Sequence, residues 1–452
     1  MKINNIFILL ILSVFLLSAC NSETPPLGIE TDPVTSVAQQ EETTLAPVGI
    51  NPSTDDELFD FIISKWQQNK AAELYEYTDA ELISLLSEKD FAYLFDSVSK
   101  IGGNLKSFSD KRSSSDSKIV TYTAKLDFDN ITADLTVSFR NLKICAFTRN
   151  LHFKNTFEID HGNGVTERYF VFENDGYKFN AVYTYINDGD SHPAVFMIAG
   201  SGSSDYNETL GILTPFEDIA LGLAENGICS LRIDKRTLNY ASEFDVRDGI
   251  NEEYLSDCIA AIEYLKNQSA TEIYLFGHSL GGQIATELVA NTGGIDGMIL
   301  FNSSARHLAD IACDQYSSVD PENTAIYTAY ANAAKSAMES SAQGNYFYGA
   351  TDYYWASYNR IDTAKNISDA NVRTLIINSK NDSQTFDEDI DMWNSLFAGS
   401  DNVTVFVYDD ISHFGYKIDT SDASSLYKRI DFPNEIISRF TAFIYHSSTL
   451  PR

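Results

Sequence analysis

Residues 273–282 read IYLFGHSLGG, and this stretch decides the fold. It opens with the apolar run Ile273 to Phe276, as a buried parallel strand does. The pattern G-x-S-x-G follows from Gly277 to Gly281, and apolar residues then recur at helical spacing from Ile284 to Val289. The stretch therefore predicts a strand, a sharp turn at Ser279 and a helix, because only glycines allow a strand and a helix to approach so closely.

Apolar runs of strand length recur through the second half of the chain. Together with residues 273–276 they make eight, the others being residues 169–172, 179–185, 194–199, 228–233, 298–301, 375–377 and 403–407. Helical segments separate most of them, which is typical of a parallel sheet, whereas the turn-rich link between the first two favours an antiparallel start. We expect an α/β domain over residues 155–452, built on an eight-stranded, mostly parallel sheet.

Residues 303–366 interrupt this alternation with Ala-rich helical pieces and a cluster of aromatic residues. We interpret the segment as a helical cap over the candidate site. Its aromatic side chains either line an apolar substrate pocket or simply pack the cap, and both interpretations stay open at this point. Tyr354 and Trp355 are the candidates for the pocket.

Ser279 has the sequence setting of a nucleophile. The free amides at the start of the following helix, that of Leu280 first, can donate to a developing oxyanion. Such a serine needs a base, and in this kind of fold the chain order is serine, acid, histidine. Of the later histidines, His307 lies at the cap and His446 in the last helical segment. His413 follows the last predicted strand and is therefore the predicted general base.

The acid that orients this imidazole should end a neighbouring strand. Asp382 meets this condition, because it comes just after the strand at residues 375–377. The rival acids belong to the next predicted helix or to the loop before the histidine: Asp387, Glu388, Asp409 and Asp410. We therefore predict a triad of Ser279, His413 and Asp382.

A second oxyanion donor is expected in the turn after the strand at residues 194–199. Gly200, Ser201 and Gly202 let the backbone come close to a substrate there, and the amide of Ser201 is the first choice, with Gly202 as the alternative. Gly200, Gly202 and His278 are also predicted to border the pocket. A phosphate-binding loop is the competing interpretation, but the lysine of a P-loop is missing.

Five segments resemble bacterial α/β-hydrolases of the carboxylesterase and serine aminopeptidase-like lipase type: residues 198–202 with Asp205, 231–236, 277–282, 378–382 and 412–414. The resemblance covers about Thr166 to Ile444. Relatives carry glycines after the run 231–236, whereas residues 237–239 here are Thr, Leu and Asn, so one pocket wall is expected to differ in shape. The resemblance implies transfer of an acyl group from a small ester to water through an acyl-Ser279 intermediate, with no metal or organic cofactor.

Two other functions stay open. A peptidase could use the same triad and would place acidic residues beside the pocket, and a catalytically silent surface-binding protein could keep the fold alone. The formal net charge of −32 argues against nucleic-acid partners, because such a field repels phosphates. The five cysteines show neither CxxC pairs nor a dense framework, so we expect no structural zinc site and no essential disulfide.

Residues 55–154 predict a small α+β domain. Apolar residues recur at helical spacing from Leu58 to Phe95, and period-two alternation then marks strands at residues 120–128 and 131–139, with a third near residues 142–146. The element order resembles the nuclear transport factor 2-like domain that precedes many secreted bacterial hydrolases. A spacer or a dimerisation surface is the expected role, since no catalytic group is evident.

The N-terminus predicts an exported, lipid-anchored protein. Lys2 precedes an apolar run too short to span a membrane, as in a signal peptide over residues 1–19. Residues 17–20, Leu-Ser-Ala-Cys, resemble the bacterial lipobox, in which the cysteine, here Cys20, is acylated. Residues 20–54 are rich in Thr, Pro, Ser and Glu and predict a flexible tether. We expect an extracytoplasmic protein that meets the membrane through its lipid only.

Overall fold

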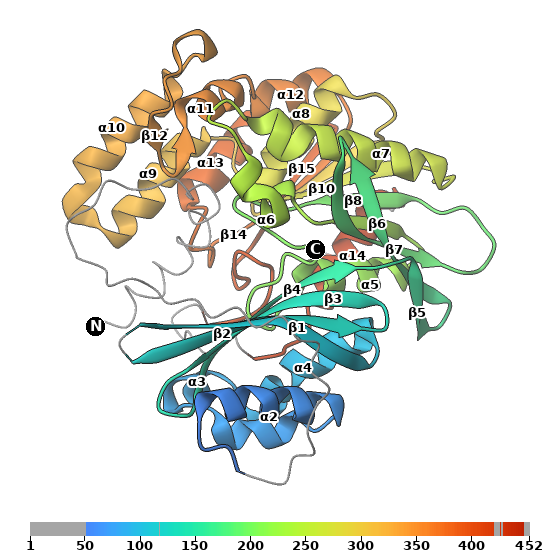
Figure 1. Cartoon of the computed structure of the whole chain (residues 1–452). Helices are drawn as coiled ribbons and strands as arrows, with labels where there is room; N and C mark the ends of the chain where they lie inside the picture. Colours follow the sequence, from blue (N-terminus) through green and yellow to red (C-terminus); the bar gives the residue numbers. More distant parts are fainter. Residues whose placement is uncertain (1–50, 117, 420–424, 426–427, 447–452) are drawn as a thin grey trace.

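A computed structural model describes residues 51–116, 118–419, 425 and 428–446 as two layers built on separate sheets (Figure 1). The predicted signal peptide, Cys20 and nearly all of the predicted tether lie outside these residues. No helix of the described part combines the length and the apolar character needed to cross a membrane.

The first layer joins four helical segments to a four-stranded antiparallel meander. The helices are α2 (Asp55–Gln67), η1 (Ala71–Tyr77), α3 (Ala80–Leu85) and α4 (Glu88–Gly102). The strands, in sheet order, are β1 (Leu105–Asp116), β2 (Ile119–Phe128), β3 (Ile131–Phe139) and β4 (Ile144–Phe153). Strand β1 was not predicted, because its residues are mostly serine, lysine and aspartate. It forms by pairing with β2, so tertiary context overrides its weak strand propensity.

The second sheet has nine strands, one more than predicted. Their order is β15-β14-β11-β10-β8-β9-β7-β6-β5. The bounds are β5 (Phe157–Gly162), β6 (Val165–Asn174), β7 (Tyr177–Ile186), β8 (Ala194–Ile198), β9 (Cys229–Ile233), β10 (Ile273–His278), β11 (Gly297–Phe301), β14 (Arg373–Ser379) and β15 (Val403–Tyr408). All eight predicted strands are present, with the antiparallel start at β6 and β7. The additional strand is β5, a short edge strand paired with β6.

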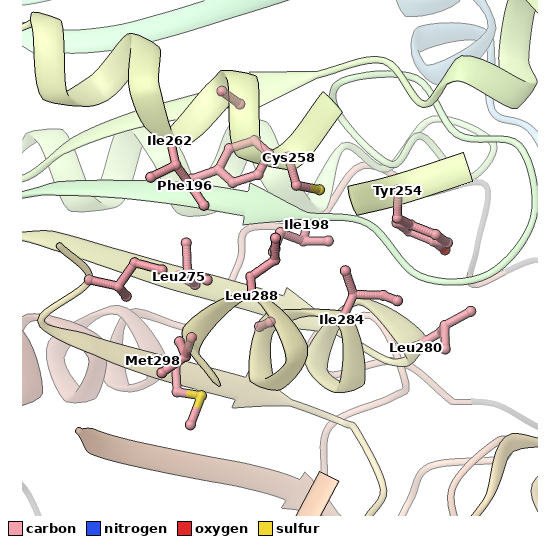
Figure 2. Close-up of a cluster of buried hydrophobic side chains, with 14 of the residues drawn as sticks. Phe196, Ile198, Tyr254, Cys258, Ile262, Leu275, Leu280, Ile284, Leu288 and Met298 are labelled. Atoms are coloured by element: carbon pink, nitrogen blue, oxygen red, sulfur yellow. The ribbon is translucent and has the colours of Figure 1, made fainter. Parts of the chain in front are cut away.

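Helices cover both faces of this sheet. On one face lie α5 (Pro215–Ala224) and α14 (Asn434–Ile444), and on the other α7 (Ser256–Asn267), α8 (Leu280–Asn291), α12 (Thr363–Ala370) and α13 (Asp387–Leu396). Alternate side chains of each strand point toward the helices on one face and then toward those on the other, as a pleated sheet requires. Figure 2 shows the face covered by α7 and α8, where side chains of the strands and the helices meet: Phe196, Ile198, Leu275, Met298, Ile262 and Leu288.

The predicted cap is the insertion between β11 and β14. It contains α9 (Leu308–Val319), η4 (Pro321–Asn323), α10 (Thr324–Lys335), η5 (Glu339–Ser341), the hairpin of β12 (Tyr346–Phe347) and β13 (Ala350–Thr351), α11 (Asp352–Tyr358) and the start of α12. The shorter segments α6 (Arg236–Tyr240), η2 (Ala241–Glu243) and η3 (Asn251–Leu255) follow β9. In Figure 1 the cap helices lie at the end of the sheet away from β5. This arrangement, with a serine turn between a central strand and helix, is that of an α/β-hydrolase.

The two layers share one apolar seam. Phe153 at the end of β4 packs edge-on against Tyr169 of β6 at 5.5 Å between ring centroids and lies 5.4 Å from Tyr206. Asn180 of β7 ties the backbones together, because its side chain accepts from the amide of Phe153 at 2.8 Å and donates to the carbonyl of Leu151 at 2.6 Å. The seam therefore fixes the first layer against the second.

The turn at Ser279 depends on an extremely close approach of α8 to the sheet. A Cβ atom at Gly281 would overlap the carbonyl oxygen of Ile198 and lie 2.7 Å from that of Ala199. A Cβ at Gly277 would overlap the backbone of Gly281, and one at Gly282 would overlap the side chain of Ser303. These three positions accept only glycine without a shift of backbone or side chain.

We predict that Gly281→Ala lowers the free energy of unfolding by about 1–3 kcal/mol or more, because the new methyl group has to displace the backbone of β8. Urea denaturation followed by fluorescence would measure the shift of the midpoint. Gly293→Ala is the matched control, since a Cβ there meets nothing within 4 Å. A Gly281→Ala midpoint equal to that of the control would contradict the steric argument.

Candidate active site

Ser279 stands at the turn between β10 and α8 in a strained backbone conformation. Its φ is 54° and its ψ is −123°, a combination that non-glycine residues rarely adopt. The amide of Ser279 donates to the carbonyl of Phe301 at 3.0 Å, which fixes the turn against the end of β11. The side chain is partly exposed, whereas His278 and Leu280 on either side are buried. The strained turn thus leaves Ser279 partly exposed between two buried neighbours.

His413 and Asp382 form a buried pair. Asp382 follows β14 and His413 follows β15, and Nδ1 of the imidazole lies 2.7 Å from Oδ2 of the carboxylate. Asp382 also accepts from the amides of Gln384 and Thr385 and from the Thr385 hydroxyl. Burial alone raises the pKa of Asp382, but His413 and these donors outweigh it, and the pKa is lowered. The carboxylate is therefore held ionised beside the imidazole.

Backbone contacts join His413 to the turn that carries Ser279. The carbonyl oxygen of His413 accepts from Nε2 of His278 at 2.9 Å and from Nδ2 of Asn302 at 2.7 Å. Strands β10, β11, β14 and β15 run parallel, so their carboxyl ends meet at one edge of the sheet. Nε2 of His413 is buried and bonds to no group of the described residues. The structure thus brings the three predicted residues to one edge of the sheet, with Nε2 of His413 unbonded among the described residues.

The rival groups are engaged elsewhere. Asp409 pairs with Lys380 and Asp410 with Lys417 at the surface. His307 lies at the start of α9, where Nδ1 accepts from the amide of Ala309 and Nε2 meets Asn359. None of these contacts involves Ser279.

Hydrogen bonds from buried side chains hold the backbone of the turn after β8. Its Gly200 amide donates to Glu208 Oε1 at 2.8 Å, and its Gly200 carbonyl accepts from Tyr254 and, at 3.2 Å, from Lys235. In a trans peptide the N–H points opposite to the C=O, so the Ser201 amide points away from Lys235 and Tyr254. Ser201, Gly202 and Leu280 all line the same pocket. This is the arrangement that a second oxyanion donor needs.

Glu208 is a site residue that the sequence did not reveal. Its Oε2 lies 2.8 Å from Nδ1 of His278, and both side chains are almost fully buried. Burial lowers the pKa of His278, but Glu208 and the His413 carbonyl outweigh it, so this pKa lies above its ordinary 6.5. The pair therefore joins the Gly200 turn, the Ser279 turn and the His413 loop. Only the structure shows it, since nothing in the sequence around residue 208 marks an acid that turns inward.

A cavity of about 190 Å³ opens beside Ser201, Gly202 and Leu280, between the sheet and the cap. Its aromatic wall includes both predicted residues of α11 and four others: Tyr354, Trp355, Phe244, Tyr316, Tyr346 and Tyr348. Gly200 and His278, which were expected to border the pocket, are not among the residues that line this cavity, and neither are Ser279, His413 and Asp382. The Gly200 amide and the His278 imidazole instead contact Glu208, and these contacts hold the turns together.

Carboxylates also border this cavity. Asp245 and Asp248 belong to the loop before η3, and Glu253 lies deeper, where Lys235 pairs with it at 2.7 Å. The nearby Thr237 is one of the residues that replace glycines of the relatives, and it lines the cavity. The departure noted in the sequence therefore does lie on the pocket wall.

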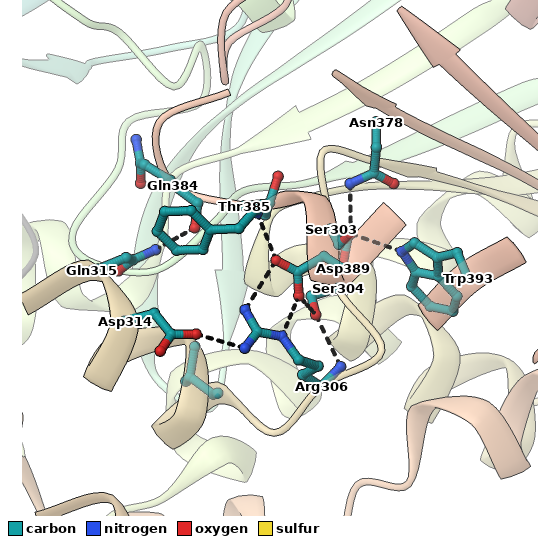
Figure 3. Close-up of polar contacts among 12 residues, drawn as sticks. Ser303, Ser304, Arg306, Asp314, Gln315, Asn378, Gln384, Thr385, Asp389 and Trp393 are labelled. Atoms are coloured by element: carbon teal, nitrogen blue, oxygen red, sulfur yellow. Dashed lines mark hydrogen bonds and ion pairs between the residues drawn. The ribbon is translucent and has the colours of Figure 1, made fainter. Parts of the chain in front are cut away.

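A buried ionic cluster anchors the cap to the sheet (Figure 3). The Arg306 guanidinium forms two bonds to Asp389 of α13, with Nε 2.7 Å from Oδ1, and a further contact at 2.6 Å to Asp314 of α9. The carbonyl of Ser303 accepts from Asn378 and from the indole of Trp393, each at 2.9 Å. Bidentate pairing of this kind fixes direction as well as distance. The cap thus has a defined position over the cavity.

No group of three or more His, Cys, Asp or Glu side chains in the described part of the chain could hold a metal ion. Cys145, Cys229, Cys258 and Cys313 are free thiols.

Esterase EstD of Thermotoga maritima is 28% identical to this chain over 225 residues, which cover 49% of this chain and 54% of EstD. The chain thus spans about half the length of this curated relative. Est1E from Butyrivibrio proteoclasticus has 16% identity, 62% and 98% coverage of the two chains, and a TM-score of 0.41. The Pyrococcus furiosus esterase Pf2001 has 13% identity, 66% and 100% coverage, and a TM-score of 0.41. No protein-family model matches the chain.

We predict that Glu208→Gln destabilises the protein in a pH-dependent way. The raised pKa of His278 means that its stabilising charge is fully present below pH 6.5 and is lost as the pH rises through the folded-state value. The loss of unfolding free energy should therefore be largest near about pH 6, at about 1–3 kcal/mol, and should shrink toward about pH 9. Urea titrations at both pH values measure it.

Glu272→Gln is the matched control. Glu272 faces His446 at 3.7 Å in an exposed position, so its effect should stay within about 0.5 kcal/mol at either pH. An equal cost of Glu208→Gln at both pH values would show that the buried pair is not ionic.

Proposed function

We propose that the chain is a serine hydrolase that cleaves carboxylic esters. The observation that carries this proposal is the buried His413–Asp382 pair at the same sheet edge as the strained Ser279. The similarity to EstD supports the ester specificity.

In the proposed reaction Ser279 Oγ attacks the ester carbonyl while His413 Nε2 takes its proton. Asp382 keeps Nδ1 protonated and stabilises the imidazolium that forms. The negative oxygen of the tetrahedral intermediate accepts from the amides of Leu280 and Ser201. His413 then gives the proton to the leaving alcohol, and a water molecule repeats the sequence on the acyl-Ser279 to release the acid.

The size and the lining of the cavity favour small substrates that carry an apolar group. At about 190 Å³ it is small, and six of the twenty residues that line it are aromatic. A peptidase that recognises a free amine is the second candidate, favoured by Asp245 and Asp248 at the cavity. Glu253 gives it little support, because its charge is already balanced by Lys235. Ester cleavage is therefore the preferred assignment.

We predict that a fluorophosphonate probe labels the native protein covalently and that Ser279→Ala abolishes the labelling. The same change should lower kcat/KM for short-chain p-nitrophenyl esters by at least about a thousandfold, since the nucleophile is lost. Ser201→Ala is the matched control, because the proposed role of Ser201 uses only its backbone amide. It should keep labelling and stay within about tenfold of native activity.

Two results would redirect the proposal. Faster turnover of aminoacyl anilides than of esters would favour the peptidase. Absence of labelling in the native protein would favour a catalytically silent surface-binding role.

We further propose that the mature protein is an extracytoplasmic lipoprotein, acylated at Cys20 and held by the tether. The sequence of residues 1–20 is the support for this proposal. The first layer would then stand between the membrane and the catalytic layer, as a spacer or a dimerisation surface of the nuclear transport factor 2-like kind.

We predict that Cys20→Ala moves the protein from the membrane fraction to the soluble fraction of the producing bacterium, because one or more acyl chains supply the attachment. Fractionation and immunoblotting measure the change. Ser18→Ala is the control, as it keeps the cysteine and should stay with the membrane. Continued membrane association of Cys20→Ala would contradict the lipid anchor.

A further inference from the structure

A second cavity, of about 310 Å³, lies between the two layers and away from the cap. Helix α4 and strand β4 form one wall, and the loop from Asp205 to the first turn of α5 forms the other. Since a water molecule takes about 30 Å³ in the liquid, the space suits a ligand of roughly ten non-hydrogen atoms. None of the proposed triad residues borders it.

Arg149 of β4 borders this cavity without the partner that a guanidinium requires. Its Nε is buried and bonds to no described group, whereas its Nη2 donates one long hydrogen bond, of 3.4 Å, to the Ser97 hydroxyl. Burial lowers the pKa of Arg149, and Asp205 offsets this only in part. Four other arginines that are at least partly buried each pair with a carboxylate: Arg232 with Glu167, Arg236 with Asp257, Arg306 with Asp389 and Arg429 with Asp218.

The carboxylates nearest the cavity do not satisfy Arg149. Asp205 is occupied by the amides of Asn207 and Thr209 and by the Thr209 hydroxyl. Glu217 accepts from Asn207 at 3.3 Å, and burial together with Glu167 raises its pKa, which favours the neutral form. Asp96 lies at the exposed rim. Arg149 therefore carries a positive charge at the cavity that no direct ion pair with a described carboxylate balances.

We propose that this cavity is a binding site for a small anion, a carboxylate or a phosphate, held by the Arg149 guanidinium. A guanidinium offers parallel donors to the oxygens of either group. Tyr93 and Tyr206 provide flat walls beside it, and Lys100 at the rim adds a second positive charge at the entrance. The site is separate from the proposed ester pocket and does not depend on the proposed catalysis.

The test measures binding directly, because the loop of Asp205 also carries Glu208 and an activity readout would mix two effects. Isothermal titration of the whole protein with succinate and, separately, inorganic phosphate should give saturable binding of one or both, with Kd of about 0.1–1 mM. The two titrations distinguish the carboxylate from the phosphate. Sodium chloride at equal ionic strength is the reference.

Arg149→Met should weaken this binding by roughly ten- to a hundredfold, as expected for loss of a charge-assisted contact. The variant should also melt no lower than the native protein without ligand, because it removes a partly buried charge that forms no salt bridge with a described residue. Arg112→Met, on exposed β1 of the same sheet, is the matched control and should bind like the native protein.

A second variant tests the proposal independently if Arg149→Met folds poorly. Glu217→Gln removes any negative charge that the Glu217 carboxyl group still carries at the cavity, so it should bind the same ligand at least as tightly as the native protein does. Absence of saturable binding to the native protein, or equal binding by Arg149→Met, would overturn the proposal. Weaker binding by Glu217→Gln would also contradict it.

Discussion

The close approach of α8 to strands β8 and β10 is the constraint on which the site depends. Three glycines remove the atoms that would hold the helix away, and the backbone of Ser279 takes up the strain that results. Because the helix starts directly against the sheet, its free amides face the same edge at which β14 and β15 end. One steric condition therefore sets the position of the Ser279 backbone and the place of the amides together.

Buried charges then hold the surrounding loops in a single arrangement. Glu208 reaches the Gly200 amide and His278, and His278 reaches the carbonyl of His413. Lys235 reaches the Gly200 carbonyl and Glu253. Burying such groups costs free energy, which their partners offset only when the geometry is good. Displacement of any one loop would leave a charge without its partner, so the pairs oppose independent motion of the loops.

The sequence allowed the central strands, the turn at Ser279 and the positions of Asp382 and His413 after two neighbouring strands to be predicted, because each follows from a local pattern or from the order of groups along the chain. Strand β1 could not be, since its polar residues become a strand only by pairing with β2. Glu208 could not be either, as its role depends on a turn that folds back against β10. The same holds for His278, which was expected to border the pocket. A residue beside Ser279 can face either the pocket or the protein interior, and the contact of His278 with Glu208 turns it toward the interior.

Arg306 and Arg149 differ in what their charges do: the charge of Arg306 holds the structure together, whereas that of Arg149 does not. Arg306 fixes the cap because two edges of its guanidinium meet carboxylates, and removing the buried Asp389 would leave a largely buried ion with only the exposed Asp314 as its partner. Arg149 lies at the seam between the layers with a buried donor that bonds to nothing in the described residues. A seam held by Phe153, Tyr169 and Asn180 does not need that charge for its packing. An apolar residue would fill the same place at lower cost, so stability alone does not account for Arg149, and an external anion does.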